Sequence, residues 1–315
     1  MFNKKIFFIA LGALILLISV SILFKMDRNK PISDSEDSYH RPGMTEGSNT
    51  LQIGLLDTEG KLIDGGSRLN IENSKLSYTI SFDSFIPEER EYMLIILADF
   101  VQTPFYVNEN QNETLSYTFK AKANESINIP TSIETANEAK EIIYLIVKKP
   151  HDLFKPQKVD SEVIDTATSL EQIVSLRFNL TGKTTKINYS KDFQQNSGGP
   201  LIETFLSKDP KELRPIFQLK GKEKIYLTVG NTLDYDMDVA IVQFLDWKQL
   251  PFSEGEKTQY INVPAKKAYS KEIELPIVSK ESNFQTFIFY KPYSVSPSDF
   301  ESQLTFGTYR LVVTP

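Results

Sequence analysis

The chain has 315 residues, a formal net charge of −6, no cysteine and two histidines, His40 and His151. The lack of cysteine excludes disulfides, thiolate metal sites and thiol nucleophiles, and two histidines cannot build a poly-histidine metal centre. Residues 1–30 carry a net charge of +4, which leaves −10 for the rest of the chain. An acidic body has no net positive field to attract a polyanion, so we expect no nucleic-acid partner.

The first element predicted along the chain is a transmembrane anchor at 6–24. These residues contain no charge, and one membrane-spanning helix needs about 20 such residues. Lys4 and Lys5 precede the run, so residues 1–5 are expected to form a cytoplasmic tail and the bulk of the chain to lie outside the membrane, at the cell surface. A cleaved signal peptide is the alternative. Residues 25–50 are polar and predict a flexible tether.

Short apolar runs separated by turn residues begin at Leu51 and predict β-strands. Residues 75–82 alternate with period two, which is typical of a half-buried strand. Residues 92–97 and 142–147 are apolar at successive positions, as expected for central strands, and residues 115–121 and 173–180 predict two further strands. We find no convincing helical period after the anchor, although 87–90 and 134–140 could each form a single helical turn.

The second part of the chain repeats the first. Residues 76–105 align with 223–252 without a gap. Both contain the motif Asp-aromatic-x-Gln-x-Pro-Phe, which comprises Asp99, Gln102, Pro104 and Phe105 in one copy and Asp246, Gln249, Pro251 and Phe252 in the other. The later landmarks follow in the same order, pairing Tyr117-x-Phe119-x-Ala121 with Ile261-x-Val263-x-Ala265, Lys149-Pro150 with Lys291-Pro292, and Arg177 with Arg310. We therefore predict a tandem duplication.

The predicted fold class is all-β, with the N-terminal transmembrane helix followed by two tandem β-sandwich domains. Each repeat has about seven short strands, which resembles the immunoglobulin or fibronectin type III architecture without its disulfide. The predicted boundaries are 51–182 for the first sandwich, 183–199 for a linker and 200–315 for the second sandwich. This architecture serves many functions, so it does not by itself predict one.

The duplicated motif has a structural and a functional interpretation. Asp99 and Asp246 could cap the backbone N–H groups that follow, while the aromatic residue after each aspartate plugs the end of its sandwich. Alternatively, the aspartate, glutamine and aromatic ring could line a ligand groove. A motif present in both repeats favours the structural interpretation, because two domains share a folding requirement more readily than a ligand.

Asp234, Asp236 and Asp238 form the most suggestive metal pattern in the chain. Alternate carboxylates can converge in a loop, and oxygen ligands suit Ca²⁺. The spacing is not that of an EF-hand, because Val239 stands where that loop requires glycine. The alternative is an acidic, solvated turn that binds no metal.

Candidate catalytic groups are sparse. Glu88, Glu89 and Glu91, or Asp234 with Asp236, could supply the two carboxylates of a glycoside hydrolase. A serine triad would have to use one of the two histidines, but the chain has no Gly-x-Ser-x-Gly elbow. We therefore expect a protein that is not an enzyme and needs no cofactor other than, at most, Ca²⁺.

The function that these features favour is that of a membrane-anchored extracytoplasmic binding or scaffold protein, with a protein or a cell-envelope polymer as its partner. The Lys-, Asn- and Ile-rich composition suggests a bacterial source. The alternatives are a Ca²⁺-dependent adhesion module and a carboxylate-based glycan-active enzyme. We expect the function to lie where the repeats differ, namely at Asp234–Asp238, at the loops 106–113 and 253–257, and at the linker.

Overall fold

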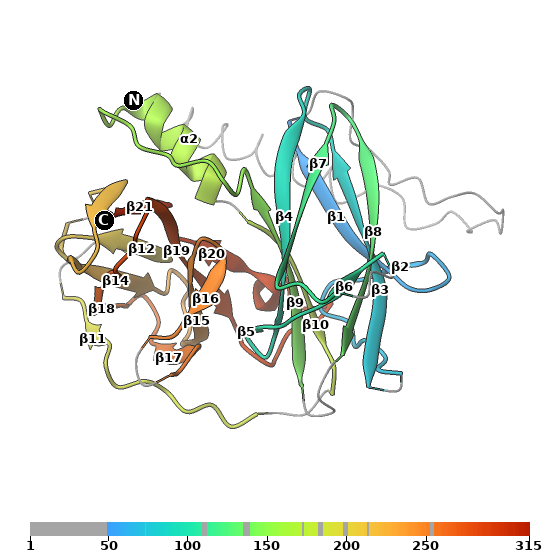
Figure 1. Cartoon of the computed structure of the whole chain (residues 1–315). Helices are drawn as coiled ribbons and strands as arrows, with labels where there is room; N and C mark the ends of the chain where they lie inside the picture. The colour runs from blue at the N-terminus through green and yellow to red at the C-terminus, as the bar shows by residue number, and fades with distance from the viewer. Residues whose placement is uncertain are drawn as a thin grey trace, which may run out of the picture. The chain divides into compact units, whose positions relative to one another are not determined.

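The architecture is all-β, as the alternating runs predict (Figure 1). The computed structural model describes residues 49–72, 74–108, 112–134, 139–171, 173–181, 185–197, 201–212, 214–252 and 255–315. Within those ranges no helix is both long and apolar enough to cross a bilayer. The predicted anchor at 6–24 and nearly all of the tether at 25–50 lie outside the described residues, so both remain predictions.

Two sheets form the first half of the described chain, up to residue 181. One sheet has the strand order β2-β1-β3-β8-β6, and the other has the order β10-β9-β4-β5, with β7 also pairing with β4. The strands are β1 Leu51–Leu56, β2 Leu62–Ile63, β3 Lys75–Ser84, β4 Arg90–Ala98, β5 Val101–Gln102, β6 Tyr106–Val107, β7 Ser116–Ala121, β8 Ser126–Glu134, β9 Glu141–Lys148 and β10 Val174–Asn179. The five runs expected to be strands correspond to β3, β4, β7, β9 and β10, and the expected runs 115–121 and 173–180 extend one residue beyond β7 and one residue beyond each end of β10.

Two more sheets form the second half, from residue 185 onward. Their orders are β11-β18-β14-β12 and β13-β21-β19-β15-β16, with β17 also pairing with β15 and β20 with β19. The strands are β11 Gln194–Gln195, β12 Thr204–Ser207, β13 Gln218–Lys220, β14 Lys224–Gly230, β15 Met237–Leu245, β16 Lys248–Leu250, β17 Gln259–Val263, β18 Ala268–Glu274, β19 Ser282–Tyr290, β20 Thr305–Gly307 and β21 Leu311–Thr314. Strand β11 falls inside the predicted linker and joins the sheet of β18.

The strand order recurs between the halves. The run β1-β3-β8 has its counterpart in β12-β14-β18, and β10-β9-β4-β5 has its counterpart in β21-β19-β15-β16. Each half also has one parallel contact beside its last strand, made by Arg68 with Asn179 in the first half and by β13 with β21 in the second. The two halves are therefore built to one plan.

Each half has its own hydrophobic core between its two sheets. In the first half, alternate residues of β4, namely Tyr92, Leu94 and Ile96, enter a core shared with Ile80 and Phe82 of β3. In the second half, Val239 and Ile241 of β15 enter the corresponding core. Alternation is expected because successive side chains of a strand point to opposite faces of the sheet.

A third core joins the halves. The other residues of β4, Met93, Ile95 and Leu97, pack in one cluster with Val242 and Phe244 of β15. The sheets that contain β4 and β15 are thus buried on both faces. This explains why residues 92–98 of β4 and 239–242 of β15 are apolar at successive positions, where a strand with one solvated face would alternate.

Helix α2, Ser161–Glu171, was not expected from the sequence. Val163 N–H donates to Asp160 Oδ1 (3.0 Å), which satisfies one of the free amides of the first turn. Ala167 and Leu170 are buried. Of the two single turns expected, residues 87–90 run instead into β4, which begins at Arg90, and residues 135–138 lie outside the described part.

Candidate functional site

The duplicated motif builds two matching hairpin turns. Asp99 and Phe100 connect β4 to β5 with φ of 49° and 65°, and Asp246 and Trp247 connect β15 to β16 with φ of 45° and 65°. Two successive positive φ angles are typical of a type I′ turn, whose twist matches that of the strands it joins. The same backbone geometry in both halves explains why the motif occurs twice.

The aspartates cap the neighbouring strand. Asp99 Oδ1 accepts the N–H groups of Lys140 and Glu141, each at 2.9 Å, and Asp246 Oδ1 accepts the N–H of Asn283 at 2.9 Å. The sequence predicted that each aspartate would cap the backbone N–H groups that directly follow it. The structure shows instead that each aspartate caps N–H groups at the start of a distant strand, β9 for Asp99 and β19 for Asp246.

The glutamines bind across the boundary between the halves, which we call the seam. Gln102 N–H donates to Gln249 Oε1 (2.7 Å), and Gln249 N–H donates to Gln102 Oε1 (2.8 Å). Gln102 Nε2 donates to the Trp247 carbonyl (2.9 Å), and Gln249 Nε2 donates to the Phe100 carbonyl (2.8 Å). Each half repeats the contact of the other, as in a two-fold symmetric dimer interface.

The two aromatic residues of the turns are buried in the seam. Phe100 is fully buried and Trp247 is 4% exposed, and both belong to the cluster shared by the halves. Trp247 Nε1 donates to the Pro150 carbonyl (2.6 Å) of the other half. The expected plugging of each sandwich end by these rings is therefore wrong: they join the halves. Phe105 packs in its own core, and Phe252 packs partly against the second core.

Two buried arginines cross the seam in the same symmetric manner. Arg177 Nη1 donates to the Tyr290 carbonyl at the end of β19 (2.6 Å). Arg310 donates to the Lys149 carbonyl (2.7 Å) and to the Lys148 carbonyl at the end of β9. The glutamines and arginines that help to reveal the duplication in the sequence thus serve the contact between the two copies.

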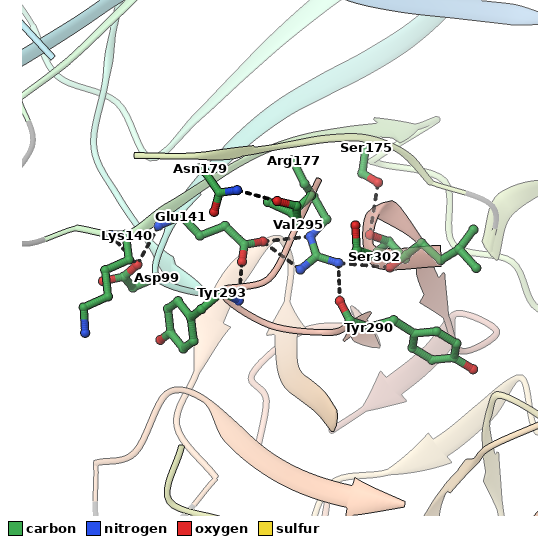
Figure 2. Close-up of polar contacts among 12 residues, drawn as sticks. Asp99, Lys140, Glu141, Ser175, Arg177, Asn179, Tyr290, Tyr293, Val295 and Ser302 are labelled. Carbon is green, nitrogen blue, oxygen red and sulfur yellow. Dashed lines mark hydrogen bonds and ion pairs between the residues drawn. The ribbon is translucent and has the colours of Figure 1, made fainter. Parts of the chain in front are cut away.

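The symmetry breaks at one position. Glu141 lies where the second half has Asn283, and its carboxylate pairs with Arg177 at 2.7 Å, both side chains being fully buried. Glu141 Oε2 also accepts the N–H of Tyr293 (2.7 Å). Figure 2 shows Asp99, Glu141 and Arg177 in succession, with Tyr293 beside Glu141. Burial raises the pKa of Glu141, although Arg177 and the Tyr293 amide oppose that shift.

Among the described residues, the equivalent arginine of the second half forms no salt bridge, although the carboxylate of Asp152 acts on it from beyond salt-bridge distance. Arg310 lies over the ring of Trp247, with 4.8 Å between its guanidinium carbon and the ring centroid. Burial lowers the pKa of Arg310 to about 10. The stacking, the carbonyl acceptors and the more distant carboxylate of Asp152 compensate this buried charge.

A groove opens on the Glu141 side of the seam. This seam groove has a volume of about 430 Å³ and is lined by Asp99 and Val101 of the first half, by residues 185–190, and by Glu256, Thr258, Gln259, Tyr260 and Tyr293 of the second half. Grooves between domains are common ligand sites. A larger cavity of about 620 Å³ lies along β3 and β8, but it involves the first half alone.

Three of the regions in which the repeats differ meet around the seam groove. The linker contributes residues 185–190 and is held by Ser190 N–H, which donates to the Tyr260 carbonyl (2.7 Å). Tyr189 Oη donates to Asp238 Oδ1 (2.8 Å), which ties the Asp234–Asp238 turn to the linker. Glu256 comes from the loop 253–257. The fourth region, the loop 106–113, lines the larger cavity through Tyr106 and Asn108.

Two tyrosines form the polar centre of the seam groove. The hydroxyls of Tyr260 and Tyr293 lie 2.7 Å apart and share a hydrogen bond. Burial and the nearby carboxylates of Asp99 and Glu141 raise the pKa of both tyrosines, that of Tyr293 to about 12. Both hydroxyls therefore stay protonated at physiological pH.

The three aspartates of the calcium hypothesis do not converge. Asp234 pairs with Lys266 (3.2 Å), Asp236 Oδ1 accepts the N–H of Ala265 (3.0 Å), and Asp238 Oδ1 accepts from Tyr189 and from Asn262. Among the described residues no group of three acidic or histidine side chains is placed to hold a metal ion. The hypothesis gains no support from this geometry.

The candidate catalytic residues are dispersed on the surface. Arg90 pairs with Glu88 (2.6 Å) and lowers the pKa of that carboxyl, whereas a general acid needs a raised pKa. His151 is largely exposed and lies 3.9 Å from Glu91. His40 is outside the described residues.

The sequence reasoning missed Glu141, Tyr260 and Tyr293. Two signals were present. Residues 92–97 and 142–147 are apolar at positions that would face solvent in an isolated sandwich, which indicates a second buried surface. Arg177 lies inside one predicted strand and Arg310 directly before another apolar run, and a charge shared by two copies at such positions indicates a shared contact.

Neither a scan against models of protein families nor a search of curated proteins finds a match to this sequence. Solved structures give weak likenesses. The C-terminal domain of the Streptococcus pyogenes antigen I/II-family protein AspA is 8% identical with a TM-score of 0.25, over 84% of this chain and 99% of that one. The Escherichia coli chaperone DraB is 11% identical with a TM-score of 0.24, over 84% and 95%. The PapD-like domain 7 of human CEP192 is 9% identical with a TM-score of 0.23, over 47% and 95%. Likeness this low carries no argument about function.

Proposed function

We propose that this chain is a membrane-tethered, extracytoplasmic binding or scaffold protein without catalytic activity, built from two tandem immunoglobulin-like or fibronectin type III-like sandwiches. The observation that carries the proposal is the seam. Reciprocal hydrogen bonds and a shared core join the halves, and the groove beside them is lined by residues of the linker and of the 253–257 loop. The Asp234–Asp238 turn is tied to this groove by the hydrogen bond between Tyr189 and Asp238. A joined pair of sandwiches presents this groove in one fixed shape, which favours binding by pre-organisation.

The apolar residues 6–24 and the polar residues 25–50 support the tethered arrangement. An anchor followed by a flexible tether leaves the folded part free to reach a partner near the bilayer. The proposed partner is a protein or a polymer of the cell envelope.

The proposal is tested with the full-length chain carrying a C-terminal affinity tag in intact cells. Protease added outside the cells should degrade the tag and the folded part. Chemical cross-linking followed by purification should recover one envelope component reproducibly. Val242→Arg, which disrupts the seam, should lose that component.

A tag that is protected in intact cells and becomes accessible only after lysis contradicts the proposed topology. Purified full-length protein that hydrolyses envelope glycans, with turnover abolished by Glu89→Gln or Asp236→Asn, contradicts the non-catalytic role and favours the carboxylate-based enzyme.

A further inference from the structure

The seam groove has the size and position of a small-ligand site. Its volume of about 430 Å³ lies within the usual range for such sites. One wall comes from the first half through Asp99, and the other from the second half through Tyr260 and Tyr293. The linker closes one side, since Ser190 is bonded to Tyr260. The groove therefore exists only when the halves are joined.

The hydroxyl groups in the groove offer both donors and acceptors. The bond between Tyr260 and Tyr293 uses one of the two hydroxyl hydrogens, so one hydrogen and several lone pairs remain for a ligand. Asn188 of the linker is exposed beside them and adds an amide donor and acceptor.

The charges around the groove are balanced. Asp99 and Glu256 line it together with Lys186, and the ammonium of Lys140 lies 5.8 Å from the centre of the Tyr293 ring. With two carboxylates and two ammonium groups, the groove attracts neither a polyanion nor a polycation. Aromatic rings combined with mixed donors and acceptors suit a neutral ligand with several hydroxyls.

We propose that the seam groove binds a sugar unit of a neutral polysaccharide, either a plain hexose or an N-acetylated hexosamine. This inference rests on the proposed function, because it specifies the envelope polymer that a tethered binding protein would engage. The tyrosine rings provide the apolar face for the sugar ring, and the two hydroxyls with Asn188 provide its hydrogen bonds.

The other half of the chain supplies a matched control. Met93 of β4 and Ala240 of β15 occupy equivalent positions in the two repeats. Met93 pairs with Thr118 on the neighbouring strand and Ala240 pairs with Tyr260, so Thr118 is the counterpart of Tyr260. His151 follows Lys149-Pro150 as Tyr293 follows Lys291-Pro292. The counterpart of the groove thus lacks both tyrosines, and the structure predicts one sugar site for each chain.

The test is titration calorimetry of the full-length protein in detergent with two neutral probes, a tetramer of N-acetylglucosamine and a tetramer of glucose. At least one probe should bind with a stoichiometry of one. Tyr260→Phe and Tyr293→Phe each remove one hydroxyl and keep the ring, so each should weaken binding about two- to tenfold. Asn188→Ala should act similarly. Thr118→Ala and His151→Ala should leave affinity unchanged.

Three results would overturn the inference: neither tetramer binds at millimolar concentration, binding is unchanged in both tyrosine variants, or an oligolysine or polyphosphate probe binds in place of the sugars. Thermal unfolding of each variant shows whether it is folded. If the sugars fail while the cross-linked envelope component is still recovered, the sugar inference fails and the proposed function stands. If both fail, the proposed function fails.

Discussion

The contact between the halves depends on a few polar side chains that each satisfy several buried groups. Gln249 accepts from the Gln102 amide and donates to the carbonyls of Phe100 and Lys257. Gln102 does the same in the opposite direction, using Trp247 and Leu115. A shorter side chain at either position could not reach all of its partners.

Gln249→Ala and Gln102→Ala should therefore destabilise the protein to a similar extent. Each substitution leaves a buried N–H of the opposite half without its acceptor, which costs about 1–3 kcal/mol. Urea unfolding followed by circular dichroism measures the loss. The exposed Gln218 is the control, and Gln218→Ala should change stability by less than about 0.5 kcal/mol. A large loss of unfolding free energy in only one of the two glutamine variants would show that the two glutamines do not contribute equally to stability.

Glu141→Ala should cost about 3–5 kcal/mol, because it leaves the buried guanidinium of Arg177 without its counter-charge and the Tyr293 amide without an acceptor. Asn283→Ala at the equivalent position should cost less, since it removes neutral hydrogen bonds alone. Guanidinium unfolding compares the two. Equal losses would argue that the ion pair has no special role.

The pH dependence of stability tests the same carboxyl. Burial raises the pKa of Glu141 in the folded state above the ordinary value of 4.5. Because the pKa of Glu141 is higher in the folded than in the unfolded state, its protonated form stabilises the fold. This stability is fully present below pH 4.5 and is lost as the pH rises through the pKa of the folded state. Glu141→Gln cannot ionise, so the wild-type protein should lose stability relative to this variant over that rise. Thermal unfolding from acidic to neutral pH measures the difference, and a constant difference contradicts the shift.

Among the elements, the strands were predicted well because their periodicity is a local property of the sequence. Helix α2 was missed, although Asp160 with Val163, Ala167 and Leu170 forms a capped amphipathic pattern. Few of its residues are both apolar and buried, so the sequence of this helix does not show the broad apolar stripe by which helices are usually recognised.

The alignment of the two repeats was correct where strands join by tight turns and drifted across longer loops. Tyr92 pairs with Phe119, and its counterpart Val239 pairs with Ile261. Phe119 therefore corresponds to Ile261, two residues earlier than the sequence alignment placed it. Strand register depends on pairing with a distant strand, which similarity along the chain cannot reveal.

The hairpin turns predict an unusual order of substitutions at Phe100. The residue has φ of 65°, a region in which any side chain is disfavoured and glycine is not. Both Phe100→Ala and Phe100→Gly lose the buried ring, but the glycine variant should be more stable than the alanine variant by about 1 kcal/mol.

Phe105 is the control for this order, because it is fully buried and has no positive φ. There the alanine variant should be the more stable one, as is usual when glycine loses more chain entropy on folding. Chemical unfolding of the four variants measures both differences. The same order at both positions would rule out a role for the turn geometry.

For the molecule as a whole, the sequence predicted two sandwiches but did not predict their union. Repetition predicts two similar domains, whereas their packing depends on faces that meet only in three dimensions. The seam groove was beyond sequence reasoning for the same reason, since Asp99, Tyr189 and Tyr260 come from separate parts of the chain. Three of the regions in which the repeats differ lie around the groove, and the expectation that function lies there stays a prediction.

The shared core also predicts how the molecule unfolds. Each half has its own core, and the third core couples them, so the wild-type protein should unfold in a single transition. Val242 is fully buried in the third core, where an arginine would be an unpaired buried charge that costs several kcal/mol. Val242→Arg should therefore separate the halves while each retains its own core. Calorimetry should then show two transitions, and amide exchange should increase along β4 and β15.

Thr118→Arg places the same charge on an exposed position of β7 and should keep the single transition. Two transitions in the wild-type protein would mean that the seam contributes little to stability. A single transition in Val242→Arg, shifted to lower temperature, would mean that neither half folds alone. In that case the seam is part of the folding unit itself, and the two sandwiches amount to one domain made of two copies of a single plan.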